Sequence, residues 1–161
     1  MKKTILWCLL MLVFNPCGAS PLGEGAFEMI SIAADEASED EESGILHFNG
    51  QFVMRSSDWH LTSEQATVYG SPDKPDRVLL EGSPARFLIN RTDLTYQGQV
   101  EGTAPVVEYL REVNLLLLSG GATLALGDEV IHSAQIAYDI STRRYQAGGT
   151  DGVQIEVPPD Y

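Results

Sequence analysis

The chain has 161 residues, with 10 Lys and Arg against 23 Asp and Glu, and a formal net charge of −13. This balance argues against binding to nucleic acid and against adsorption to anionic membrane surfaces, because both depend on basic patches. Both cysteines, Cys8 and Cys17, lie near the N-terminus, so the rest of the chain has no thiol for a disulfide framework or a cysteine metal site.

The N-terminal segment has the plan of a secretory signal peptide, which we expect to occupy residues 1–19 and to be cleaved. Lys2 and Lys3 form a basic start, Thr4 to Phe14 is almost entirely apolar, and the small residues before Ser20 suit a signal peptidase. The apolar run has 11 residues, whereas a membrane-spanning helix needs about 20. A retained membrane anchor is therefore the weaker alternative. Without Lys2 and Lys3, 8 basic residues face 23 acidic ones, a formal charge of −15.

The remainder predicts a single all-β domain over residues 20–161, in which residues 158–161 form a disordered tail. Turn signals recur every 8 to 12 residues, and no window of helical length has an amphipathic apolar stripe. The expected strands are, in chain order, Met29–Ala33, Ile45–Phe48, Gln51–Arg55, Trp59–Leu61, Glu64–Tyr69, Arg77–Glu81, Ala85–Leu88, Leu94–Gln97, Val106–Leu110, Asn114–Leu118, Ala122–Leu126, Val130–Ser133, Gln135–Tyr138, Arg144–Ala147 and Val153–Val157. We expect a hairpin turn at Asn49-Gly50, because both residues tolerate positive φ, and a loop over residues 70–76.

A repeat with an offset of 70 residues runs through this pattern. Gly50, Asp58, Leu61, Ser63, Gln65, Ala66 and Val68 correspond in order to Gly120, Asp128, Ile131, Ser133, Gln135, Ile136 and Tyr138. A partial third copy between them indicates units of 30 to 40 residues, with Gly82 equivalent to Gly50. Such a unit cannot bury its apolar face alone, so the units are expected to stack into an elongated structure, with a corner or bulge at each glycine.

Apolar residues two positions apart recur along the strands and therefore share one face of the sheet. The pairs are Ile30/Ile32, Leu46/Phe48, Phe52/Met54, Ala85/Phe87, Val107/Tyr109, Leu116/Leu118, Leu124/Leu126 and Ile136/Tyr138. For each residue alone the simplest interpretation is an ordinary core, and the alternative is an interior that admits lipid. Trp59 is expected to be a half-buried strand aromatic, with stacking on a sugar as the alternative.

Catalytic and metal-binding chemistry finds little support in the sequence. His47, His60 and His132 lack the spacing of a zinc site, so we interpret them as surface or strand-facing residues. Ser63, His132 and Asp128 could supply a catalytic triad, but no Gly-x-Ser-x-Gly elbow accompanies them. We therefore expect no catalytic residue, no metal site and no cofactor.

Several landmarks in order resemble the OstA-like LptA family of periplasmic lipopolysaccharide transport proteins, from about Ile30 to Ala147. The landmarks are Ile30 to Asp35, Asn49-Gly50, Leu61 to Val68, Glu81 to Phe87, Val100 to Ala104, Tyr109 and Leu116 to Ala122. The resemblance implies a twisted, open-ended β-jellyroll of consecutive antiparallel strands. It also implies end-to-end stacking, transport of lipopolysaccharide from the inner to the outer membrane, acyl chains in the apolar interior, and a driving ATPase elsewhere in the pathway.

Residue by residue, the resemblance assigns lipid-facing roles to Ile30, Phe87 and Tyr109. With the inward-facing pairs, the expected lipid-binding set is Ile30, Ile32, Phe48, Phe52, Phe87, Val107, Tyr109, Leu116, Leu118, Ile136 and Tyr138. Arg111 departs from the family pattern, which has an apolar residue there. Either it lies at the mouth of the groove near a phosphate, or the register of that strand differs.

The expected function is thus non-enzymatic transport in the periplasm of a Gram-negative envelope. The expected partners are lipopolysaccharide acyl chains, the inner- and outer-membrane components of the pathway, and further copies of the chain. The edge strands Met29–Ala33 and Val153–Val157 are candidates for strand addition, unless Pro158-Pro159 and the acidic run Asp35–Glu42 block them. Two alternatives are an LptC-like protein that keeps its N-terminal anchor, and a structural or carbohydrate-binding β-module with a filled core.

Overall fold

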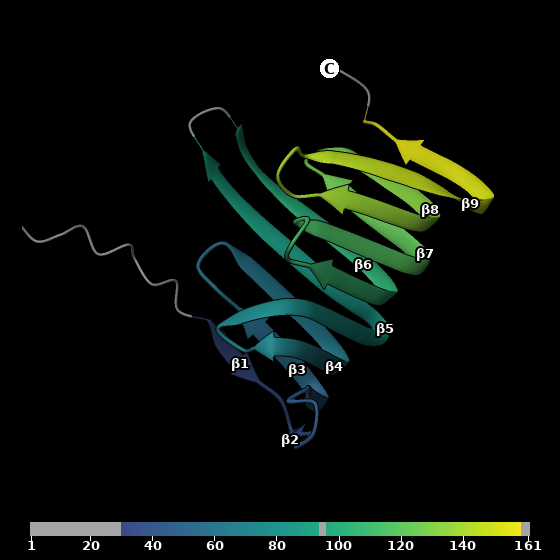
Figure 1. Cartoon of the computed structure of the whole chain (residues 1–161). Coiled ribbons are helices and arrows are strands. Elements are labelled where there is room, and N and C mark those ends of the chain that lie inside the picture. The colour runs from purple at the N-terminus through teal and green to yellow at the C-terminus, as the bar shows by residue number, and fades with distance from the viewer. Residues whose placement is uncertain (1–29, 94–95, 159–161) are drawn as a thin grey trace, which may run out of the picture.

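The computed structural model describes residues 30–93 and 96–158, which form one open antiparallel sheet (Figure 1). The strands are β1 (Ser31–Ala33), β2 (Glu36–Glu39), β3 (Leu46–Arg55), β4 (Trp59–Ser71), β5 (Lys74–Asp93), β6 (Tyr96–Leu110), β7 (Leu115–Leu126), β8 (Glu129–Asp139) and β9 (Arg144–Glu156). Consecutive strands pair from β3 to β9, and β1 and β2 pair with successive halves of β3. The expected all-β fold of consecutive antiparallel strands is confirmed.

Some expectations concern parts of the chain that lie outside this description. They are the signal peptide at residues 1–19, the start of the first expected strand at Met29, Leu94, and most of the expected tail, residues 159–161. In the part of the chain that is described, no helix could cross a membrane.

A line of β-bulges folds the sheet onto itself. The pairing register shifts once near the middle of every long strand pair, between Asn49/Phe52, Thr62/Gln65, Glu81/Ala85, Thr103/Val106, Ser119/Ala122 and Ser133/Gln135. Because a bulge bends its strand, a row of aligned bulges makes a corner. We call the half of the sheet that includes β1 layer 1, and the half that includes β2 layer 2. The two layers enclose a trough that is open opposite the corner (Figure 1).

The glycines expected at unit boundaries lie at this corner, but the hairpin expected at Asn49-Gly50 is wrong. β3 continues through both residues, because φ angles of 73° at Gly50 and 44° at Gln51 bend the strand without reversing it. In the same way, pairs of expected short strands are the two halves of longer bent ones. The expected loop at residues 70–76 shrinks to the turn at Pro72-Asp73, since β4 extends to Ser71 and β5 begins at Lys74.

The 70-residue repeat corresponds to two equivalent hairpins, β3–β4 and β7–β8. Its paired serines, Ser63 and Ser133, are each only 9% exposed and lie beside the corner. The Ser63 Oγ donates a hydrogen bond to the Gln65 backbone oxygen at 2.7 Å, and the Ser133 Oγ donates one to the Gly148 oxygen at 2.9 Å. Backbone groups at a bulge lack their regular cross-strand hydrogen bonds. A short hydroxyl side chain at this position supplies the missing hydrogen-bond partner. The repeated glycine and serine positions are therefore the positions at which the sheet bends.

Inward-facing side chains line up in rows along the trough. The row nearest the corner includes the small residues Ala85, Ala104 and Ala122, and it has the large side chain of Phe52 beside Ser63 at its N-terminal end. The next row of layer 1 is Met54, Leu61, Phe87, Gly102, Leu124, Ile131 and Ile155. The corresponding row of layer 2 is Phe48, Ala66, Leu80, Val107, Leu118, Ile136 and Ala147.

Gly50→Ala is expected to lower the free energy of unfolding by about 1–3 kcal/mol, because alanine is strained at positive φ. The added Cβ would also lie 2.3 Å from the Asp35 Oδ2 atom, so the N-terminal edge would have to shift. Gly148→Ala is the matched control, since its Cβ would enter open space at another corner position and its φ is outside the left-handed region. Urea denaturation of both variants tests this expectation, and equal losses would contradict it.

Candidate functional site

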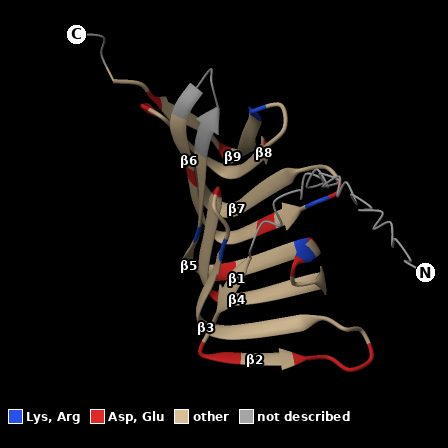
Figure 2. Ribbon diagram, turned by 90° about the vertical axis from the view of Figure 1, so that its left-hand side faces the viewer, with Lys and Arg blue, Asp and Glu red and all other residues tan. Residues whose placement is uncertain are grey.

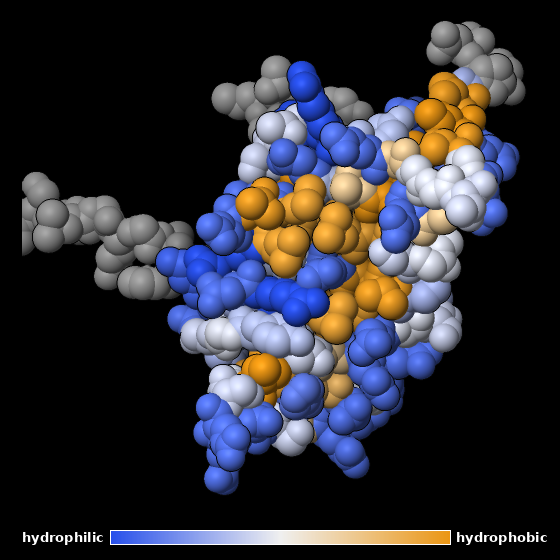
Figure 3. All heavy atoms as spheres, turned by 45° about the vertical axis from the view of Figure 1, so that its right-hand side comes forward, coloured by the Kyte–Doolittle hydropathy of each residue, from blue (hydrophilic) through white to orange (hydrophobic). Residues whose placement is uncertain are grey.

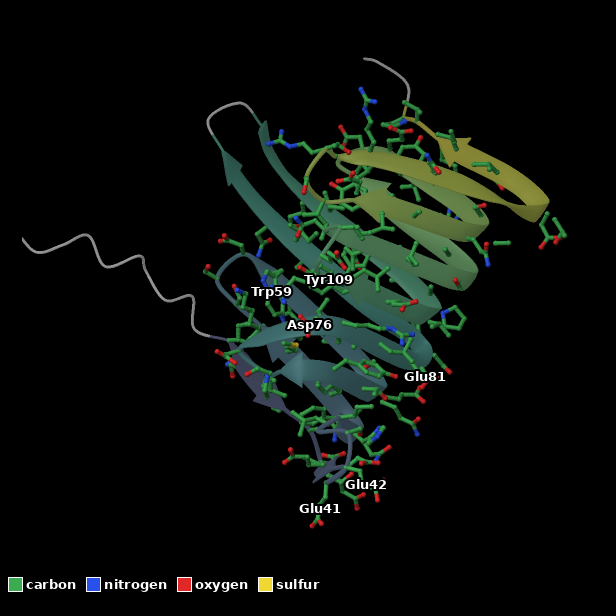
Figure 4. All side chains as sticks on the ribbon, viewed as in Figure 1. Glu41, Glu42, Trp59, Asp76, Glu81 and Tyr109 are labelled. Carbon is green, nitrogen blue, oxygen red and sulfur yellow. The ribbon has the colours of Figure 1, made fainter. Side chains whose placement is uncertain are left out.

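An apolar pocket of about 290 Å³ lies between the two layers, at the strand ends that are farthest from the corner. The apolar wall on the layer 1 side is Ile30, Met54, Trp59, Leu61, Phe87 and Ile89. The apolar wall on the layer 2 side is Val78, Tyr109, Leu116 and Ile140. The rest of the lining is Asp73, Lys74, Pro75, Arg111 and Asn114. Figure 4 shows Trp59 and Tyr109 on this open side, away from Glu81 near the corner. A largely apolar pocket with a polar side at its mouth suits an amphiphile.

Four of the eleven predicted lipid-binding residues line this pocket: Ile30, Phe87, Tyr109 and Leu116. They include all three that the family resemblance assigned. The other seven lie in or against the packed interior, away from the pocket: Ile32, Phe48, Phe52, Val107, Leu118, Ile136 and Tyr138. Most of these side chains are fully buried by neighbouring apolar residues, so most of the trough is filled by the protein's own core. The apolar pocket is the part of the trough's open side that these side chains leave unfilled.

Several pocket residues were missing from the predicted set, namely Met54, Trp59, Leu61, Val78, Ile89 and Ile140. The alternation could have identified Ile89, which shares a face with Phe87 two positions earlier. Val78 is two positions before Leu80, but Leu79 between them is also apolar, so the alternation does not say which face points inward. The cross-strand pairing places Val78 beside Tyr109. Trp59 is half-buried and packs against the core, as expected for a strand aromatic.

Arg111 is part of the pocket lining, and the alternative of a different strand register does not hold. The predicted register holds to the end of β6, where Leu110 pairs with Arg77, and Arg111 is the first residue of the following turn. Its Nε donates to the Pro75 backbone oxygen at 3.0 Å, and its guanidinium forms an ion pair with Asp76. The backbone nitrogen of Arg111 also donates to the Asp76 oxygen at 3.0 Å. These contacts join the turn after β6 to the start of β5.

Tyr109 combines an apolar ring with a polar tip at the same mouth. Burial raises the pKa of its hydroxyl, and the nearby charge of Arg111 acts in the opposite direction. The hydroxyl therefore stays protonated and neutral at physiological pH. A neutral tyrosine can contact hydrocarbon with its ring and remain hydrogen-bonded to water at its tip.

The turn between β8 and β9 holds Ile140 in the pocket wall and depends on Asp139. The Asp139 Oδ1 accepts hydrogen bonds from the backbone nitrogens of Ser141 and Thr142, both at 2.9 Å. The bond from Thr142 is the main reason that the pKa of Asp139 is lowered. A carboxyl whose pKa is lowered by folding contributes stability above its unfolded pKa of about 3.9 and loses it as the pH falls through the folded value.

Asp139→Asn is therefore expected to weaken the acid dependence of stability. An asparagine oxygen can accept the same two bonds but does not titrate. The thermal midpoint of the wild type should fall more than that of the variant between about pH 5 and about pH 2, measured by circular dichroism. Parallel curves for the two proteins would contradict this assignment.

Structural hydrogen bonds involve Ser63 and His132, two of the three groups that might have suggested catalysis. His132 Nδ1 and Thr123 Oγ1 lie 3.0 Å apart, Ser63 donates to backbone, and Asp128 is in the turn between β7 and β8. His47 is exposed, and His60 is half-buried. Among the described residues, no group of three or more His, Cys, Asp or Glu side chains could hold a metal ion.

Comparisons of this chain with known protein families and solved structures agree with the observed fold. Residues 31–144 match the protein family described as "LptA/(LptD N-terminal domain) LPS transport protein". A solved structure of LptH, described as the LptA homologous periplasmic component of the conserved lipopolysaccharide transport device from Pseudomonas aeruginosa, aligns with a TM-score of 0.73. Its sequence identity is 18%, over 82% of this chain and 96% of that chain, so the likeness shows the fold. No match was found among curated proteins. The family match covers most of the chain, which therefore belongs to the LptA/LptD N-terminal family of lipopolysaccharide transport proteins, a non-enzymatic family.

Proposed function

We propose that this protein is a periplasmic carrier that shelters lipopolysaccharide acyl chains on the open side of its trough and stacks end to end to bridge inner- and outer-membrane components. The observation that carries the proposal is the apolar pocket in a fold of the lipopolysaccharide transport family. Because the trough is open opposite its corner, a hydrocarbon chain can lie inside while the attached sugars remain in water.

The size of the pocket favours partial shelter. A cavity of about 150 Å³ accommodates one benzene molecule, so a pocket of about 290 Å³ has room for part of one hydrocarbon chain. Burial of a methylene group contributes about 0.8 kcal/mol, and full enclosure of several long chains would therefore hold the cargo too tightly to release. A carrier that shelters a chain segment at a time can transfer its cargo to the next site.

Photocrosslinking to lipopolysaccharide tests the binding site. A photoreactive side chain at Leu116, which lines the pocket, is expected to crosslink. Leu117 is the matched control, because it follows Leu116 in β7 and points to the outer face of the sheet. Tyr109 offers a second, half-exposed position. Equal labelling at Leu116 and Leu117, or none at Leu116 and Tyr109, would count against binding in the pocket.

Stacking is supported by apolar side chains at both ends of the sheet. On the C-terminal edge, Val153, Ile155 and Val157 are 46%, 50% and 68% exposed. Figure 3 shows apolar atoms gathered at the end of β9. On the N-terminal edge, Ile30 and Ile32 are only partly buried against the core. An open edge of this kind is a template for another strand, and apolar side chains along it favour pairing over exposure to water.

The inward-facing rows predict a register for this proposed contact between copies. Ile155 belongs to the same layer 1 row as Met54, and Ile32 pairs with Met54 at the other end of the sheet. A continuous row across two copies places Ile155 of one beside Ile32 of the next. The same reasoning in layer 2 places Ala147 beside Ala37, since Ala37 pairs with Phe48. Both contacts are antiparallel, because β9 runs from layer 2 to layer 1 and the β1–β2 segment runs the other way.

Cysteine crosslinking of the processed chain tests the register, because no cysteine follows Cys17. The double variant Ile32→Cys with Ile155→Cys is expected to give disulfide-linked oligomers upon oxidation. The control, Ile32→Cys with Gln154→Cys, moves one thiol to the opposite face of β9. A strictly monomeric product from the first variant at high protein concentration would remove the stacking proposal.

A further inference from the structure

A pair of cationic side chains flanks the mouth of the apolar pocket in an otherwise strongly acidic protein. The pocket lining contains Lys74, at the start of β5, and Arg111, in the turn after β6, beside the apolar wall of Tyr109 and Leu116. Figure 2 shows Asp and Glu concentrated around β2 and the turn that follows it. From this arrangement we infer that Lys74 and Arg111 form a subsite for the phosphate of a phosphorylated acyl lipid whose hydrocarbon chain enters the pocket.

This inference rests on the proposed function, because it assigns a headgroup contact to the same pocket. Arg111 is held in place before any ligand arrives, by its hydrogen bond to the Pro75 oxygen and by its ion pair with Asp76. A guanidinium has five N–H donors, so these two contacts leave donors for a phosphate. Because its orientation is already set, little side-chain entropy is lost when it binds an anion.

Lys74 adds a second, exposed cation beside Arg111. Its side chain is exposed, and it forms no ion pair among the residues that the structure describes. A lysine can extend its apolar stem along the pocket wall and keep its ammonium group in water, where it can reach an anion. The nearest acidic side chain on the lining, Asp73, accepts a hydrogen bond from the Ser71 hydroxyl, and this bond lowers its pKa.

The charges on the outer face of the sheet explain why phosphate binding is expected only at the mouth of the pocket. Arg77 and Arg86 form ion pairs as Arg111 does, but with Glu108 and Glu101 on the outer face of the sheet, away from the pocket lining. With a formal charge of −15 on residues 20–161, the protein as a whole repels phosphate. At the mouth, two cations offset the two nearby carboxylates, Asp73 and Asp76. A phosphate can therefore approach the pocket more easily than the outer wall, which orients an amphiphile with its chain inward.

Intrinsic fluorescence can report binding directly, because Trp59 lines the pocket and is the only tryptophan after residue 7. The processed protein is titrated at low salt, below micelle-forming concentrations, with dodecyl phosphate, dodecyl maltoside and inorganic phosphate. Dodecyl phosphate is expected to bind about fivefold more tightly than the uncharged maltoside, a typical gain from partly exposed charge contacts. The difference should decrease at 0.5 M salt, and inorganic phosphate alone should cause no comparable change.

Three variants separate the headgroup contact from the hydrocarbon site. Lys74→Gln and Arg111→Gln are each expected to remove most of the preference for dodecyl phosphate over dodecyl maltoside, measured as the ratio of the two dissociation constants. Arg111→Lys retains the charge and should retain part of the preference, which guards against an effect of lost turn contacts. Arg55→Gln is the matched control, since Arg55 is exposed and lies outside the pocket lining.

The outcomes distinguish this inference from the proposed function. Equal affinity for both dodecyl compounds, or an unchanged preference in Lys74→Gln and Arg111→Gln, would overturn the phosphate subsite and leave the hydrocarbon site standing. Binding of inorganic phosphate as tight as that of dodecyl phosphate would identify a free-anion site and likewise overturn it. Failure of all three ligands to bind would overturn both the subsite and the pocket as a lipid site.

Discussion

Phe87→Ala is expected to lower the free energy of unfolding by about 3–5 kcal/mol, the usual cost of removing a buried aromatic ring. Phe87 is fully buried and belongs to the core row of layer 1 that runs from Met54 to Ile131. Leu88→Ala is the matched control, because Leu88 is the next residue of β5 and faces outward. Urea denaturation of the two variants measures the difference, and similar losses would contradict the assigned orientation.

A second substitution tests why Phe87 fits where it does. Its cross-strand partner is Gly102, and a Cβ at Gly102 would lie 2.0 Å from the Phe87 Cε1 atom. The ring thus occupies space that any other residue at position 102 would fill. Gly102→Ala is expected to cost about 1–3 kcal/mol through overpacking.

The same Gly102→Ala change should cost much less in a Phe87→Ala background, where the ring is absent. A double-mutant cycle measures this coupling. Additive effects of the two substitutions would show that the ring and the glycine do not share the space between β5 and β6. The pocket lies beside Phe87, so titrations of these variants with dodecyl maltoside would also show whether an enlarged pocket binds a chain more tightly.

Ile155→Asp is expected to abolish end-to-end association, with at least a tenfold increase in the dissociation constant. The substitution places a charge in the apolar row that would continue onto Ile32 of the next copy, and an unpaired charge buried in such a contact costs several kcal/mol. Because Ile155 is 50% exposed in the single chain, the monomer should remain folded.

Gln154→Asp is the control for Ile155→Asp, since it adds the same charge one residue away on the outer face of β9. Sedimentation velocity over a concentration series measures association, and circular dichroism verifies the fold. If both variants associated like the wild type, the contact would not use the inward row of β9. If both were equally impaired, the effect would come from net charge and not from the predicted register.

The sequence by itself determined the fold class, the alternation of inward and outward residues, and the repeat. Val107 and Tyr109, for example, are two apart in an alternating segment, and this spacing alone places both side chains on one face of the sheet. The 70-residue repeat could be recognised because its glycines have positive φ and its serines bond to backbone oxygens beside the corner in both hairpins. Local chemistry of this kind is written directly into the order of residues.

Only the tertiary structure decided where the strands bend, where the interior stays open, and what Arg111 contacts. A glycine with positive φ is compatible with a hairpin turn or a bulge, and at Gly50 cross-strand hydrogen bonding selects the bulge. Asp76 and Arg111 are 35 residues apart, and only the pairing of β5 with β6 brings them to one mouth. Alternation determines which residues face inward, but the space left between two layers depends on how the aligned bulges fold the whole sheet.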